Sequence, residues 1–236
     1  METITPNPQD SERPLMSHAT EGDVQRSHFQ SHATEGDVQR PQLQQASPVT
    51  DEQLQDAIRT VLRAIGEDPS REGLADTPDR IVRMWRELFR GYDPTQKPRI
   101  TTFENDAHNT EMVFDTGDFY SMCEHHVMPF FGQYYFAYIP QDDGRILGIS
   151  KIARVVGYCS ARLQLQERLA HDIIEMLSDA LDNQVQGFAI VLKGIHTCKS
   201  MRGVKNKGNM NVSYFTGVFR TNPSLREEFF HMIAMQ

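Results

Sequence analysis

Apolar side chains fall into a regular pattern only after about fifty residues of mostly polar sequence. Over residues 54–65 they recur every three or four positions, which is the spacing of a helix with one buried face. Gly66 is a typical helix end, so we expect the helix to stop there. A second helix is predicted to begin at Thr77–Pro78, because a capping residue followed by proline favours the first helical turn. Its apolar stripe runs to Phe89, and Gly91 is expected to end it.

The pattern changes near residue 111, where short runs of β-branched and aromatic residues replace the helical spacing. Strands are predicted over residues 112–114, 119–127, 130–139, 187–195 and 212–220, and helices over 150–160, 167–181 and 223–235. In the strand over 130–139, Tyr134, Phe136 and Tyr138 share one face, which is typical of a half-buried strand. The order of these elements predicts an α+β layer, in which two helices cover one face of a four-stranded antiparallel sheet.

Residues 1–50 have a different character. They are rich in Gln, Ser, Pro, Asp and His and poor in large apolar groups, so we expect them to be disordered. The segment SHATEGDVQR occurs twice without change, at Ser17–Arg26 and at Ser31–Arg40. Two short polar copies indicate a duplicated tail segment and not a solenoid. The predicted organisation is therefore a tail (1–50), an N-terminal helical region (51–110) and a catalytic domain (111–236).

Charge and cysteine content exclude several classes of protein. The formal net charge of −8 argues against nucleic acid as a partner, because phosphate contacts require a basic surface. Three cysteines are too few, and an odd number, for a secreted disulfide framework. The first residues lack the basic and then apolar pattern of a signal peptide, and no stretch approaches the roughly 18 apolar residues that span a bilayer. We therefore expect a cytoplasmic protein without a membrane partner.

Two cysteines and a histidine indicate a metal site. Cys123 and His126 form a Cys-x-x-His motif, whose thiolate and imidazole can reach one tetrahedral ion, and Cys198 offers a third soft ligand. Three protein ligands with one open position are typical of catalytic zinc, whereas structural zinc usually has four. The alternative is that both thiols are ordinary core residues, as we expect for Cys159. His125 and His196 each lie within two residues of a candidate ligand. Their presence favours the metal site, because histidine can transfer protons next to an activated water.

Four segments, SMCEHH, GISKIARVV, RLQLQERLA and HTCKSMRGV, together closely resemble the GTP cyclohydrolase I family. The resemblance runs from about Asp51 to the C-terminus. It implies a tunnelling fold preceded by N-terminal helices, a bound Zn²⁺ ion and GTP as the substrate. The implied reaction is hydrolysis of GTP at C8, with formate release and rearrangement to 7,8-dihydroneopterin triphosphate, the first step of pterin and folate biosynthesis. A homodecamer with active sites at the subunit interfaces is implied as well.

The same resemblance implies a role for each candidate site residue. Zinc would be bound by Cys123, His126 and Cys198, while His125 and His196 would handle protons around the purine imidazole. Glu167 and the adjacent Gln166 are implied to recognise the guanine edge. The residues implied to hold the triphosphate are Ser150, Lys151, Arg154, Arg202 and Arg80. Ser150 is also implied to be a catalytic residue.

Some of these roles agree with elementary chemistry. Ser150, Lys151 and Arg154 cluster at a predicted helix start, where free N–H groups and the helix dipole favour phosphate. A solvated basic face is the alternative interpretation of this cluster. The carboxylate of Glu167 can accept hydrogen bonds from the guanine ring N–H and amino group. Alternatively, it stabilises the dipole of its own helix.

Residues 205–216 depart from the family pattern, because Asn, Lys and aromatic residues stand where the family usually has Ser and Thr. A paralogue that acts on a related purine nucleotide therefore stays open as an alternative. Two other functions also remain. One is a non-catalytic module of the same fold, clamped by zinc or by a disulfide between Cys123 and Cys198. The other is a tunnelling-fold relative with a cysteine nucleophile, such as a nitrile reductase.

Overall fold

The computed structural model describes residues 49–236. The predicted tail and its duplicated SHATEGDVQR segment lie outside the described residues, apart from the last two positions of the tail. None of the described helices combines the length and the apolar character that crossing a bilayer requires.

The first two predicted helices are confirmed. Helix α1 (Asp51–Ala64) begins with a capping box, in which the side chains of Thr50 and Gln53 each bind the other's backbone N–H. Helix α2 (Thr77–Leu88) begins with Pro78 in its first turn. Two short 3₁₀ helices, η1 (Arg90–Tyr92) and η2 (Pro94–Gln96), follow.

The predicted antiparallel sheet is confirmed, with one added strand. Its four antiparallel strands are β2 (Val113–Cys123), β3 (Met128–Pro140), β6 (Val185–His196) and β7 (Met210–Phe215). A short fifth strand, β5 (Leu163–Gln164), pairs with β2 in parallel, so that the order is β5-β2-β3-β6-β7. Strands β1 (Thr102–Glu104) and β4 (Arg145–Leu147) form a separate two-stranded ladder. This is the α+β tunnelling fold, preceded by N-terminal helices.

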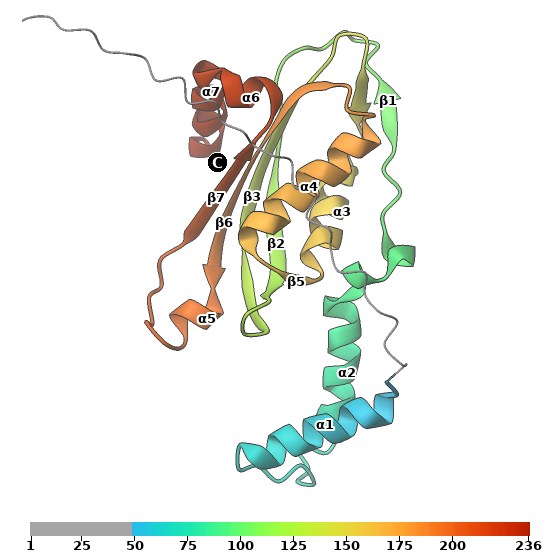
Figure 1. Ribbon diagram of the computed structural model, residues 1–236, viewed down its shortest axis with the longest axis vertical. Helices are drawn as coiled ribbons and strands as arrows, with labels where there is room; N and C mark the ends of the chain where they lie inside the picture. The colour runs from blue at the N-terminus through green and yellow to red at the C-terminus, as the bar shows by residue number, and fades with distance from the viewer. Residues whose placement is uncertain (1–48) are drawn as a thin grey trace, which may run out of the picture. The chain divides into compact units, whose positions relative to one another are not determined.

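Helices α3 (Ile149–Ser160) and α4 (Gln166–Ala180) lie side by side on one face of the sheet, as predicted (Figure 1). The main core lies between these helices and the strands. Side chains of β3 alternate between the two faces, so Phe136 and Tyr138 enter this core while Tyr135 and Ile139 face the opposite side.

The opposite face of β3 is also covered, which the sequence pattern did not predict. Helices α6 (Gly217–Thr221) and α7 (Pro223–Ala234) pack their buried Phe219 and Phe229 against it. Strand β3 is therefore buried on both sides near its C-terminal end, and not half-buried.

Three predicted strands were wrong in their limits. The strand expected over 212–220 ends at Phe215, because Gly217 adopts a positive φ of 52° and starts helix α6. A Cβ atom at this glycine would lie 2.0 Å from the Gln186 carbonyl oxygen, so the tight turn requires glycine. The segments expected over 112–114 and 119–127 form one strand that ends at Cys123, followed by a turn.

Candidate metal centre and nucleotide pocket

Two loops that are far apart in sequence meet at one end of the sheet (Figure 1). Strand β3 pairs with β2 on one side, where Cys123 is opposite Met128, and with β6 on the other, where His196 is opposite Phe130. The turn after β2 and the short helix α5 (Thr197–Ser200) after β6 therefore both lie at the start of β3. The hydroxyl of Thr197 fixes α5 there by donating a hydrogen bond of 2.6 Å to the Pro129 carbonyl.

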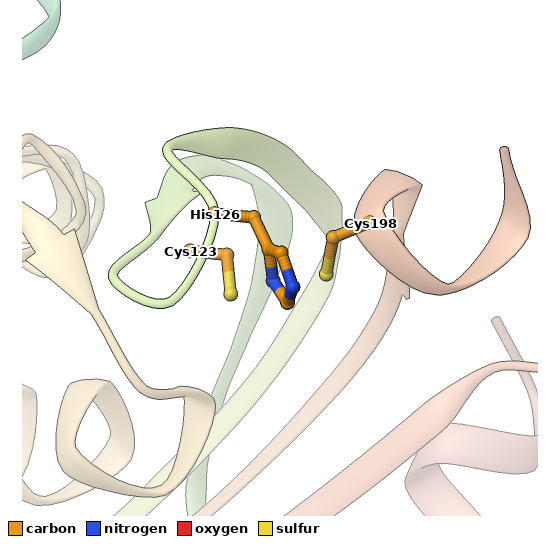
Figure 2. Close-up of side chains that lie close together, drawn as sticks. All are labelled: Cys123, His126 and Cys198. Atoms are coloured by element: carbon orange, nitrogen blue, oxygen red, sulfur yellow. The ribbon is translucent and has the colours of Figure 1, made fainter. Parts of the chain in front are cut away.

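This arrangement brings the three predicted metal ligands together. The ligand atoms of Cys123, His126 and Cys198 all lie within 4.8 Å of one another, and Figure 2 shows the two sulfurs on either side of the imidazole. Cys123 is buried, Cys198 is half-buried and His126 is exposed, so solvent can reach the group. Within residues 49–236, no fourth His, Cys, Asp or Glu joins this cluster. Two sulfurs and one nitrogen with an open position fit the donor set of catalytic zinc.

The electrostatics of the two thiols also fit a cation. Burial, together with the neighbouring Cys123, raises the pKa of the Cys198 thiol, while the charge of Arg202 opposes this rise. With its raised pKa the Cys198 thiol resists ionisation, yet the thiolate is the form that binds a metal. A bound cation would remove this conflict, because it stabilises both thiolates.

Two further histidines flank the metal cluster. His125 Nδ1 lies 3.9 Å from the Cys123 sulfur. The His196 ring stacks on Phe130, with 4.4 Å between the ring centroids and an angle of 5° between the planes. Burial lowers the pKa of His196 and the nearby Lys199 lowers it further, whereas the charge of Glu167 opposes both.

A pocket of about 390 Å³ opens beside the cluster, within the usual size range of small-ligand sites. Its lining includes all three predicted metal ligands, both neighbouring histidines, Gln166 and Glu167. The remaining lining residues are Gln164, Leu165, Lys199, Gly208, Asn209 and Met210.

The residues expected to hold the triphosphate are mostly elsewhere in the same chain. Ser150 belongs to the first turn of α3. The last residue of this helix, Ser160, lies near the metal cluster, because its carbonyl accepts a hydrogen bond of 2.8 Å from the hydroxyl of Ser121, two residues before Cys123 on β2. Ten residues of helix place Ser150 about 15 Å from Ser160. Lys151 and Arg154 lie near Ser150 on α3 and do not line the pocket.

The two remaining arginines differ from each other. Arg80, on α2, forms an exposed ion pair with Asp76 at 3.0 Å and does not line the pocket. Arg202 does reach the metal cluster, because its Nη1 donates a hydrogen bond of 2.7 Å to His126 Nε2.

Part of the pocket wall was not predicted from the sequence. Lys199 donates to the Gly208 carbonyl at 3.3 Å, and the Lys199 carbonyl accepts from the Asn206 N–H at 3.2 Å, so the loop after α5 folds back over the pocket. The position of Lys199 next to Cys198 was the only available signal, since the loop has no periodic pattern.

Arg168 connects two parts of the site, and this role was also not predicted from the sequence. Its guanidinium pairs with Glu124, which lies between the metal-cluster residues of the turn, and donates to Gln164 Oε1 at 2.9 Å. The turn that carries Cys123 and His126 is thereby tied to the start of helix α4.

An α+β tunnelling fold with a three-residue candidate metal cluster beside a small-molecule pocket indicates an enzyme with a candidate metal centre. Comparison with known families agrees, because the family model described as GTP cyclohydrolase I matches residues 54–234. The chain belongs to the GTP cyclohydrolase I family.

Individual relatives cover most of the chain. GTP cyclohydrolase 1 of Caldanaerobacter subterraneus subsp. tengcongensis is 44% identical over 186 residues, which cover 78% of this chain and 97% of that protein. GTP cyclohydrolase 1 of Clostridium perfringens is 42% identical over 190 residues, covering 79% of this chain and 100% of the relative. Among solved structures, the apo form of the archaeosine synthase QueF-Like is 20% identical, with a TM-score of 0.36 over 45% of this chain and 93% of that one.

Proposed function

We propose that this chain hydrolyses GTP at C8, releases formate and forms 7,8-dihydroneopterin triphosphate, which is the first step of pterin and folate biosynthesis. One observation carries the proposal: a single pocket contains the metal cluster, two additional histidines and a free carboxylate. Family membership supports the same reaction. We further propose a cytoplasmic setting, where Cys123 and Cys198 stay reduced and available as ligands.

Zinc is the proposed metal, held by Cys123, His126 and Cys198. When bound, zinc supplies Lewis-acid chemistry that makes a water molecule nucleophilic near neutral pH. The buried Cys123 and the half-buried Cys198 would hold the ion together with the exposed His126, and all three line the pocket. The Arg168–Glu124 pair keeps the ligand-bearing turn in place during the reaction.

His125 and His196 are proposed to handle protons at the imidazole part of guanine. Both line the pocket beside the metal cluster. Protonation of the ring nitrogen makes C8 more electrophilic, and a second proton transfer allows the opened ring to lose formate. Because burial lowers the pKa of His196, this side chain is neutral at physiological pH and ready to accept a proton.

Glu167 is proposed to recognise the guanine edge. Its exposed side chain lines the pocket and forms no hydrogen bond or ion pair with residues 49–236 in this structure. A carboxylate in that position can accept two hydrogen bonds, one from the ring N–H and one from the amino group.

The active site is proposed to be shared between subunits of a homodecamer. Ser150, Lys151 and Arg154 lie at the far end of α3 from the metal cluster of their own chain. As a triphosphate-binding group, together with Arg80, they would therefore act in the pocket of a neighbouring subunit. The strands at both sheet edges, β5 and β7, offer unpaired backbone groups through which neighbours can associate.

A related purine nucleotide is the second candidate substrate. Asn209, which belongs to the segment that departs from the family pattern, lines the pocket. Competition of ATP or ITP with GTP for turnover distinguishes the two candidates.

The direct test is to incubate zinc-loaded protein with GTP and to measure formate and, after oxidation, a fluorescent pterin. We expect both products, and we expect Cys198→Ala to lose the bound zinc and the activity together. Cys159→Ala is the matched control, because Cys159 lies in the core on α3 and not at the pocket. Zinc bound at full stoichiometry by Cys198→Ala would contradict the proposed ligand set, and absence of both products from the unmodified protein would contradict the proposed reaction.

A further inference from the structure

The carboxamide of Gln166, the first residue of α4, is fully engaged with the protein. Its side-chain nitrogen donates two hydrogen bonds, to the Leu192 carbonyl at 2.8 Å and to the Met210 carbonyl at 2.9 Å. Gln166 is 0% exposed. Both amide protons are therefore used, and neither is available to guanine.

These two bonds fix the orientation of the amide group. A reversed amide would direct its oxygen at two carbonyl oxygens, and all three atoms can only accept. The Gln166 oxygen must therefore face away from Leu192 and Met210. On that side it lies 3.0 Å from His196 Nε2.

A fixed acceptor at Gln166 determines which nitrogen of His196 carries the proton. Since Gln166 Oε1 can only accept, His196 Nε2 must donate. The second nitrogen, Nδ1, has no hydrogen-bond partner among residues 49–236 and is left for a substrate.

Neighbouring residues hold the side chains of Gln166 and His196 in one geometry. Gly194 lies on the same face of β6 as Leu192 and His196, and a Cβ atom there would lie 2.9 Å from Gln166 Oε1. The missing side chain provides the space in which the carboxamide sits. One face of the His196 ring stacks on the Phe130 ring.

We propose that Gln166 is a positioning residue that acts through His196, and that it does not contact guanine. It holds the imidazole with Nε2–H directed into the protein and Nδ1 directed to the substrate. The inference builds on the proposed reaction and replaces the guanine-binding role expected for Gln166, while Glu167 keeps that role alone.

The test is a double-mutant cycle in zinc-loaded protein with Gln166→Leu, His196→Ala and the pair. Removing a general acid–base typically lowers kcat by about 10²–10⁴-fold. We expect Gln166→Leu to lower kcat by about tenfold or more with KM for GTP changed by less than about threefold, and to add nothing to His196→Ala. A large rise in KM, or effects that multiply in the double variant, would overturn the proposal.

Two additional measurements keep the result decisive if Gln166→Leu does not fold. Gly194→Ala retains every hydrogen-bonding group but displaces the carboxamide, so we expect kcat to fall; an unchanged kcat contradicts the proposal. Magnetic resonance of isotope-labelled histidine should show His196 protonated at Nε2 and not at Nδ1 in the neutral ring, and the opposite tautomer contradicts it. Absence of turnover in the unmodified protein would instead count against the proposed reaction.

Discussion

Neighbouring residues in this site take different roles because their side chains leave α4 in different directions. Gln166 is enclosed by β6 and β7, whereas Glu167, one position later, is exposed at the pocket. Sequence adjacency therefore does not imply a shared function, and each role follows from what the side chain contacts.

Glu167 provides a test of guanine recognition at the scale of one residue. Replacing it by Gln removes the charge but keeps the size, and hydrogen bonds to a charged group contribute about 1.5–3 kcal/mol each. We expect Glu167→Gln to raise KM for GTP by about 10- to 100-fold. Glu175→Gln is a suitable control, because Glu175 lies on the same helix but not at the pocket. Equal KM values for the two variants would exclude a role for Glu167 in binding.

A second residue-scale prediction concerns Asp115 on β2. Burial raises the pKa of Asp115 above its ordinary value of 3.8, although the Tyr134 hydroxyl donates a hydrogen bond of 2.8 Å to it. Because the folded-state pKa exceeds the unfolded one, the folded protein binds the proton more readily, and stability is lost as the pH rises through the folded pKa. Asp115→Asn keeps an acceptor for Tyr134 and removes the half-buried charge.

We therefore expect Asp115→Asn to raise the thermal unfolding midpoint near neutral pH. The difference in midpoint from the unmodified protein should shrink as the pH falls through the raised folded-state pKa of Asp115, because the native carboxyl is then protonated. The exposed Asp118 on the same strand provides the control, since Asp118→Asn changes a side chain in contact with solvent and should leave the unfolding midpoint near neutral pH nearly unchanged. If the difference in unfolding midpoint instead grew in acid, the contribution of Asp115 to stability would have the opposite sign.

At the scale of elements, local sequence patterns determined where helices and strands form, whereas long-range contacts determined where one of the strands ends. The alternation on β3, the helical spacing of apolar residues in α1 and the Thr77–Pro78 start of α2 were sufficient to predict those elements. The end of β7 was not predictable, because the turn at Gly217 depends on close approach to Gln186, which no local pattern encodes.

The metal site was predictable for a similar local reason, but only in part. Cys-x-x-His places Cys123 and His126 within reach of one ion, whereas Cys198 joins them only because β3 lies between β2 and β6. The backbone contacts of the loop after α5, through Lys199, follow from tertiary structure and had no sequence signal of their own.

Gly217 and Gly203 provide an element-scale prediction. Both have positive φ angles, 52° and 62°, but a Cβ atom at Gly217 would clash with backbone, whereas at Gly203 it would meet nothing within 4 Å. We expect Gly217→Ala to lower the free energy of unfolding by about 3 kcal/mol or more and Gly203→Ala by only about 1 kcal/mol. Denaturant unfolding followed by circular dichroism compares them. Similar losses in both variants would mean that the φ angle alone, and not the turn contact, determines the requirement for glycine.

At the scale of the whole molecule, the candidate site residues form two groups separated by the length of α3. Cys198 belongs to the group at the metal end, and Arg154 belongs to the group at the first turns of α3. A site shared between neighbouring subunits is the arrangement in which both groups act on one nucleotide.

Mixing two inactive variants tests this arrangement. If Cys198→Ala and Arg154→Ala subunits assemble randomly from equal amounts, each site has a chance of one half for an intact metal group and one half for an intact cationic group. About one quarter of the sites should then be complete, and about one quarter of the original turnover should return. Each variant alone, unfolded and refolded in the same way, is the control. Turnover that stays at the level of the separate variants would place both groups in one subunit.

Strand β3 contributes none of the three metal-binding side chains, although it lies between the strands on either side of the cluster. A cation held by Cys123 and Cys198 therefore cross-links the ends of β2 and β6 across an intervening strand. Demetallation should consequently speed backbone amide exchange around the turn after β2 and around α5, while amides near Tyr138 and Phe188, at the opposite end of the sheet, keep their protection. An ion that supplies the proposed chemistry would thus also determine how rigid the mouth of its own pocket is.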